Sequence, residues 1–182
     1  MTSEARPTAY ETKAGDVAQA AMQDSPALLF AYAEVAKKAQ TELFDTAQHI
    51  ASRGPFLVAK EVLPAMREAG RGTFLFSNNA ASLRGRKRYT GQSLYYPRVL
   101  MRTLAQVLTE EYSEHGVHVA NVVIDGLIDS PGTRALPLAQ QRPELVMNPE
   151  KLAEAFWYLH TQDRSAWTHE LQLTPYPTKP SY

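Results

Sequence analysis

The chain of 182 residues contains no cysteine, which excludes disulfides, thiolate nucleophiles and thiolate metal ligands. Its formal net charge is +0, so bulk charge gives no attraction to nucleic acid or to an anionic membrane surface. Its apolar runs are far shorter than a membrane helix requires. The opening residues, Met1 to Pro7, are polar and lack the pattern of a secretion signal. We therefore expect a cytoplasmic protein with neither a nucleic-acid partner nor a membrane partner.

Glycine is also scarce. The sequence has 9 glycines, and Gly15 alone precedes Gly54. Glycines in a loop before a helix let the backbone approach a phosphate group, so their scarcity argues against a nucleotide-binding loop. Hydrophobic residues make up 44% of the chain, which is enough for one domain with a core. The 12 prolines gather partly near the end of the chain, where Pro177 and Pro180 indicate an extended tail.

These patterns divide the chain into a polar leader (residues 1–24), one domain (25–176) and the tail (177–182). The sequence Asp24-Ser25-Pro26 is typical of a helix start. Apolar residues at helical spacing continue from there to about Ala69, with a bend expected near residues 52–55. Gly70 and Gly72 end this helical region.

Three short apolar runs predict strands, over residues 72–77, 117–124 and 169–174. Helices are expected to start at Pro97 and at Asn148-Pro149, and residues 125–149 to form an irregular or partly helical connection. Helices and strands then alternate, which predicts an α/β sandwich of three layers around a small, mostly parallel sheet. A sheet of three strands has exposed edges, and we expect something to cover them.

Several of these segments resemble the short-chain dehydrogenase/reductase family. The segment 53–66 resembles its fourth helix, 70–77 the turn into its fifth strand, and 104–106 part of its fifth helix. The segment 116–126 resembles the sixth strand with its cofactor-side turn, and 164–173 resembles the final strand. The resemblance runs from about Phe44 to Tyr176 and is weakest over residues 86–98. It implies the C-terminal part of a Rossmann-like fold.

The cofactor-binding half of the family has no counterpart here. In that family a glycine-rich loop after the first strand holds the pyrophosphate at a helix N-terminus. Nothing before Arg53 supplies such a loop, and the first four strands are unmatched. The expected fold is therefore reduced, without the N-terminal cofactor-binding strands, and no cofactor is expected. Asp125, Gly126 and Ser130 resemble the loop that contacts nicotinamide, and we interpret them as vestigial.

The catalytic residues that the resemblance implies are also degenerate. The family uses a tyrosine, a lysine four residues later, a serine and an asparagine. Their positions hold Leu94, Arg98, Asn79 and Ala51 in this chain. In the family the lysine lowers the pKa of the tyrosine so that the phenol transfers a proton near neutral pH. Leucine transfers no proton, so the ordinary mechanism is not expected.

The leading hypothesis is a non-catalytic subunit, or pseudoenzyme partner, of an oxidoreductase. The family resemblance implies docking through the helices that span about residues 28–69 and 97–112. The partner is then a second copy or a full-length short-chain reductase. The alternative is a cofactor-independent isomerase, cyclase or dehydratase with a remodelled pocket at Tyr95, Tyr96 and Arg98.

Four other features could suggest a binding or catalytic site, but each is given a structural interpretation. The basic run from Arg84 to Tyr89 is interpreted as a solvated loop. His115 and His118 are placed on a surface turn, because a third metal ligand is not evident nearby. Trp157, Tyr158 and Trp167 are assigned to the core or to an interface. The following acidic residues lie on a loop of unknown course and carry little weight as a carboxylate pair: Asp125, Asp129 and Glu144.

Overall fold

A computed structural model of the chain describes residues 41–83 and 97–180. The chain divides into two compact units, residues 1–46 and 47–182. The described part of the first unit, residues 41–46, is helical. The predicted leader, the helix start at Asp24 and the basic run from Arg84 to Tyr89 lie outside the described residues. The boundaries predicted for the domain and the tail therefore stay predictions.

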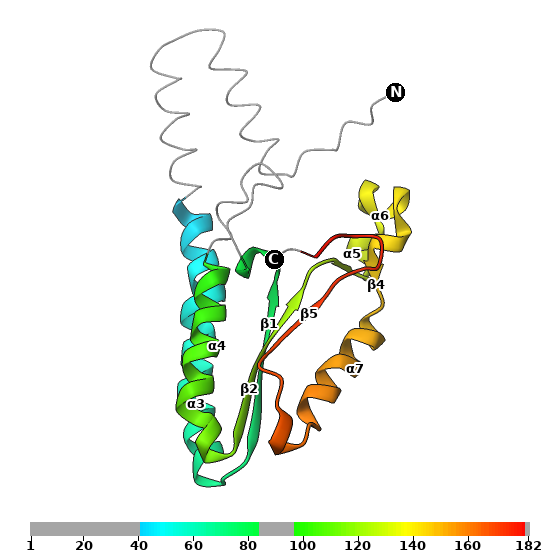
Figure 1. Ribbon diagram of the computed structural model, residues 1–182. Coiled ribbons are helices and arrows are strands. Elements are labelled where there is room, and N and C mark those ends of the chain that lie inside the picture. The colour runs from blue at the N-terminus through cyan, green and yellow to red at the C-terminus, as the bar shows by residue number, and fades with distance from the viewer. Residues whose placement is uncertain (1–40, 84–96, 181–182) are drawn as a thin grey trace, which may run out of the picture. The chain divides into compact units, whose positions relative to one another are not determined.

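The second unit has three layers (Figure 1). Its sheet has the order β1-β2-β5, and both pairings are parallel. The strands are β1 (Gly72–Asn79), β2 (Val117–Ile124) and β5 (Glu170–Leu173). Helices α3 (Gly54–Glu68) and α4 (Arg98–Tyr112) cover one face, and α7 (Pro149–His160) packs on the other. The predicted α/β sandwich with a small parallel sheet is confirmed.

The central strand β2 explains why both faces need a cover. All eight of its residues are buried, as its β-branched sequence predicts. Successive side chains point to opposite faces, so Val117 and Val119 join the core under α3 and α4. Ala120 and Val122 join the core under α7. One strand thus contributes to two separate apolar clusters.

The bend predicted near residues 52–55 is a π-helical turn, His49–Arg53, between the helix at residues 41–48 and α3. The N–H of Gly54 donates to the carbonyl of His49, five residues back. Pro55 follows, and its ring nitrogen has no hydrogen to donate. The ordinary four-residue ladder is therefore interrupted at this point.

The other helix ends agree with the sequence. Pro97 precedes α4, and the 3₁₀ turn Ser113–His115 ends it. The side chain of Asn148 accepts a hydrogen bond from the N–H of Glu150 at 2.8 Å and caps α7. Three further 3₁₀ turns are Ala80–Ser82, Pro143–Leu145 and Arg164–Ala166.

The connection after β2 contains more regular structure than the sequence indicated. It holds α5 (Pro131–Arg134), α6 (Pro137–Gln141) and two short strands, β3 (Leu127–Ile128) and β4 (Val146–Met147). These two strands pair in parallel as a second, small sheet. A two-residue strand has no hydrophobic period, so the sequence pattern gave no signal for it.

Some predicted core residues are exposed. Phe56 and Val58 belong to the apolar residues at helical spacing, but both are more than half exposed. Ala59 and Leu63 fill the contact with the sheet instead, with Val62 and Met66 beside them. Trp157 and Tyr158 were assigned to the core or to an interface, and both are exposed in this chain. Among the described residues, no helix combines the length and the apolar character needed to cross a membrane.

Candidate functional site

The carboxyl edge of the main sheet is the candidate site. Because all three strands are parallel, their last residues lie at the same edge. Ligands of open α/β sheets bind at this edge. Asn79 ends β1, and Asp125 with Gly126 follows β2. These are three of the positions that the sequence singled out, and the fold brings them to one side of the molecule.

Asn79 caps the turn that follows β1. Its side-chain oxygen accepts a hydrogen bond from the N–H of Ala81 at 3.0 Å. Its carbonyl accepts a second one from the hydroxyl of Ser82 at 2.7 Å. The residue at the family's serine position therefore holds local backbone in place.

A network of hydrogen-bonded polar side chains begins beside it, on the α4 face of the sheet, with Asn78 and Asn121 buried and Arg102 and Glu170 partly exposed. Asn78 donates to the carbonyl of Arg98 at 3.2 Å and to the side-chain oxygen of Asn121 at 3.3 Å. Asn121 donates in turn to Glu170 at 3.1 Å. Arg102 donates to both carboxylate oxygens of Glu170, at 2.6 and 2.7 Å. These hydrogen bonds join β1, β2, β5 and α4.

The Arg102 hydrogen bonds hold the pKa of the Glu170 carboxyl below its usual range, and the bond from Asn121 adds to this. This network of hydrogen bonds was not predicted from the sequence. Its one sequence signal is Asn121 inside an otherwise apolar strand, because a polar side chain buried there needs partners.

The remaining catalytic positions are only partly described. Ala51 is buried in the π-helical turn, and its methyl group offers no hydrogen bond. Arg98 is the first residue of α4, is half-buried, and its carbonyl is held by Asn78. Leu94, Tyr95 and Tyr96 lie outside the described residues. Of the three residues proposed for the alternative pocket, the structure therefore describes Arg98 but not Tyr95 or Tyr96.

The turn after β2 is closely packed. The buried Asp125 accepts a hydrogen bond from Gln172 at 3.2 Å, and its N–H donates to the carbonyl of Leu173 at 2.8 Å. A methyl group on Gly126 would lie 2.6 Å from the sulfur of Met147 and 2.8 Å from Pro175. A larger residue here would have to displace Met147 and the Pro175 ring, so packing by itself favours a glycine at this position.

Ser130 has a local partner as well. Its hydroxyl oxygen accepts a hydrogen bond from the N–H of Thr133 at 3.1 Å and caps α5. The hydroxyl also donates to the Thr133 side chain at 2.9 Å. Ser130 therefore starts a helical turn beside the loop that the sequence analysis interpreted as vestigial.

The three acidic residues considered as a carboxylate pair have separate partners. Asp129 pairs with Arg134 at 2.5 Å, and Glu144 pairs with Arg142 at 2.5 Å. These hydrogen bonds lower the pKa of both carboxyls. Asp125 contacts Gln172, so the three do not act as a pair.

His118 is not on a surface turn, as the sequence suggested, but buried in β2. Its ring nitrogens lie 3.0 Å from the carbonyl of Leu159 and 2.9 Å from that of Thr168. The ring stacks on Trp167, with centroids 4.9 Å apart. Burial lowers the pKa of His118, and this outweighs the carbonyl contact with Thr168. Within residues 41–83 and 97–180, the structure contains no cluster of three potential metal ligands.

The sequence and the fold were compared with those of known proteins. No protein-family model matches the sequence, and no curated protein matches it. Solved structures do match. A short-chain dehydrogenase from Rhodopseudomonas palustris is 27% identical over 74% of this chain and 53% of its own, with a TM-score of 0.57.

Two further structures show the same fold at lower identity. An alcohol dehydrogenase from the archaeon Thermococcus sibiricus, complexed with 5-hydroxy-NADP, is 18% identical over 76% of this chain and 56% of its own, with a TM-score of 0.62. A dehalogenation enzyme is 21% identical over 74% of this chain and 59% of its own, with a TM-score of 0.63. The chain spans somewhat more than half the length of these structures. It is therefore a short-chain dehydrogenase/reductase-like protein.

Proposed function

We propose that this chain is a non-catalytic subunit that docks on a second copy or on a full-length short-chain reductase. The observation that carries this proposal is the set of apolar side chains that α3 and α4 turn to solvent. Each helix buries one face against the sheet, through residues such as Leu63 and Ala105. The exposed large apolar residues of the two helices are Phe56, Leu57, Val58, Val99, Leu100 and Val107.

Exposed apolar surface of this kind is typical of protein interfaces. Burying an apolar side chain contributes about 1.5–3 kcal/mol relative to leaving it exposed. Burying the exposed side chains of α3 and α4 in a docked complex therefore stabilises the complex relative to the free chain. The proposed interface lies on the helices that the family resemblance implied, which span about residues 28–69 and 97–112. Residues 28–40 lie outside the described part.

The carboxyl edge supports the non-catalytic part of the proposal. At the described family positions, Ala51 has no polar side-chain atom and Asn79 holds local backbone. Gly126 packs against Met147 and Pro175, which accounts for this glycine without a ligand. None of these arrangements positions a group for proton transfer.

The decisive experiment is affinity purification of the tagged full chain from its native extract, with the masses of the recovered proteins. We expect a full-length short-chain reductase in fixed ratio, or a homo-oligomer. The double variant Leu57→Asp and Val107→Asp should lose that companion, because it places charge on both exposed helix faces. Tyr176→Ser is the matched control, since Tyr176 is 90% exposed and lies outside α3 and α4.

A hydride-transfer assay tests the non-catalytic part. We expect the isolated chain to give no NAD(P)-dependent turnover, and measured hydride transfer to a carbonyl substrate would falsify the proposal. Turnover of any other substrate, abolished by Tyr95→Phe, would instead favour the cofactor-independent enzyme. Docking that survives the double helix variant would place the interface elsewhere.

A further inference from the structure

Strand β1 has an open edge. Among the described residues it pairs with β2 and with no other strand. Natural edge strands are usually short, bulged, or protected by charged residues or proline. The eight residues of β1, Gly72 to Asn79, include neither a charge nor a proline. Within residues 41–83 and 97–180, this edge is therefore available for pairing with another strand.

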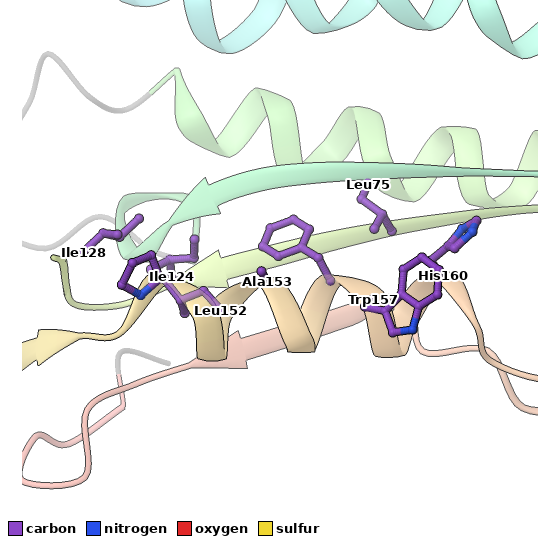
Figure 2. Close-up of a pocket in the computed structure, with 9 residues that line it drawn as sticks. Leu75, Ile124, Ile128, Leu152, Ala153, Trp157 and His160 are labelled. Atoms are coloured by element: carbon purple, nitrogen blue, oxygen red, sulfur yellow. The ribbon is translucent and has the colours of Figure 1, made fainter. Parts of the chain in front are cut away.

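An apolar groove of about 620 Å³ adjoins this edge, between β1 and α7. Figure 2 shows Leu75 and Ile124 on the sheet side, and Ala153 and Trp157 on the α7 side. Its lining is apolar except for His160. Trp157 is 66% exposed, a large exposure for an indole. Among the described residues, α7 thus covers β2 fully but the α7 face of β1 only in part, since Leu75 is half-buried against the α7 cluster and Ser77 is exposed.

The sequence of β1 is complementary to itself in one antiparallel register. When two copies pair around Leu75, that residue faces its own counterpart across the two-fold axis. Phe74 then lies opposite Phe76, and Thr73 lies opposite Ser77. Directly opposite residues share one face of the sheet, so apolar residues meet apolar residues on both faces. Pairing around Phe76 instead would set Leu75 against Ser77.

We infer that β1 of this chain pairs antiparallel with β1 of a second copy around Leu75, so that two three-stranded sheets join. The two-fold axis is perpendicular to the sheet, so both α7 helices lie on one face. The two grooves adjoin there, and the indoles of Trp157 lose contact with water. The formal net charge of +0 leaves little repulsion between copies. This contact is separate from the α3 and α4 surfaces.

The absence of cysteine makes a cross-linking test direct, because any introduced thiol is unique. In Leu75→Cys the two thiols belong to directly opposite residues, whose Cα atoms are about 4.5–5.5 Å apart in antiparallel sheets. That spacing suits a disulfide, which needs about 4.4–6.8 Å. We expect a wild-type dimer in native mass spectrometry, and oxidation of the full-length variant to a covalent dimer.

Ser77→Cys is the matched control, on the same face of the same strand. In this register Ser77 lies four residues, or about 13 Å, from its own counterpart, so it should cross-link at least tenfold less. Mixing Ser77→Cys with Thr73→Cys should restore a covalent heterodimer. Equal cross-linking of Leu75→Cys and Ser77→Cys, or a folded Leu75→Cys chain that stays monomeric, overturns the inference.

The outcome is independent of the helix interface. Cross-linking of Leu75→Cys should persist in the background of Leu57→Asp and Val107→Asp, because neither residue lies on β1. If that background abolishes both the dimer and the cross-link, the copies meet through the helices and the β1 contact is refuted. A monomeric wild-type chain whose β1 amides resist hydrogen exchange would also refute it, because another part of the same chain would then cover the edge.

Discussion

The two faces of the main sheet are covered to different extents. Under α3 and α4, the core reaches all the way across β1 and β2 and includes Phe76, which is 4% exposed. Under α7, the core is equally tight over β2, where Leu159 is fully buried, but on β1 only the half-buried Leu75 packs against it. Leu75 is also part of the groove lining. Among the described residues, two helices cover one face and one helix covers the other, so the less covered area falls at β1.

The largest expected effect compares two leucines on opposite sides of this boundary. Leu63 is 1% exposed under the sheet face that α3 and α4 cover, and Leu63→Ala should lower the free energy of unfolding by about 2–5 kcal/mol. Leu75→Ala should cost about 1 kcal/mol, because the groove leaves no closed cavity. Urea denaturation of both variants measures the difference. Equal losses would mean that the groove is filled.

The polar chain on the α4 face should produce the next largest effect. Asn121→Leu leaves Asn78 without its side-chain acceptor and removes one donor to Glu170, so it should destabilise the fold by about 1–3 kcal/mol. Ser77→Ala is the control, because Ser77 is exposed and should change stability by less than about 0.5 kcal/mol. A neutral Asn121→Leu would show that the chain of hydrogen bonds adds no net stability.

The same polar chain predicts a pH dependence. The folded-state pKa of Glu170 lies below its unfolded value because of Arg102, so this contribution is present above about pH 4.5. It is lost as the pH falls through the lower, folded-state pKa. With both side chains about one-third exposed, the contribution should be about 1 kcal/mol. Glu170→Gln should flatten the stability profile from about pH 7 to about pH 3, and an unchanged profile would contradict this.

The smallest expected effect on folding lies in the open groove. Trp157→Ser should change the unfolding free energy of the monomer by less than about 0.5 kcal/mol, because the indole is already 66% exposed. If β1 edges pair as inferred, the same variant should weaken the dimer at least tenfold. Titration by analytical ultracentrifugation separates the two quantities. A large loss of monomer stability would show that Trp157 packs within its own chain.

Much of the fold was predictable because its elements carry strong local patterns. The segment Val117 to Ile124 is rich in β-branched residues, and its strand boundaries were predicted to the residue. Asn148-Pro149 predicted the start of α7, because Asn148 is a capping residue and Pro149 suits the first helical position. The exposure of Phe56 and Val58 was not predictable, because an apolar residue at helical spacing does not reveal whether its own chain covers it.

The site was less predictable for the same reason. His118 was placed on a surface turn with His115 because no third metal ligand was evident nearby, yet the contacts that bury it come from Leu159, Trp167 and Thr168. The polar chain from Asn78 to Glu170 joins residues up to 92 positions apart, and no local pattern links them.

Sequence by itself determined the order of the main helices and strands and the small parallel sheet. These follow from local periodicity and capping residues. Tertiary structure alone decided that Gly126 packs on Met147, that Glu170 pairs with Arg102, and that, within the described residues, β1 pairs on one side only and adjoins an apolar groove. Each of these depends on which distant segments meet, and that is set by packing across the whole sheet.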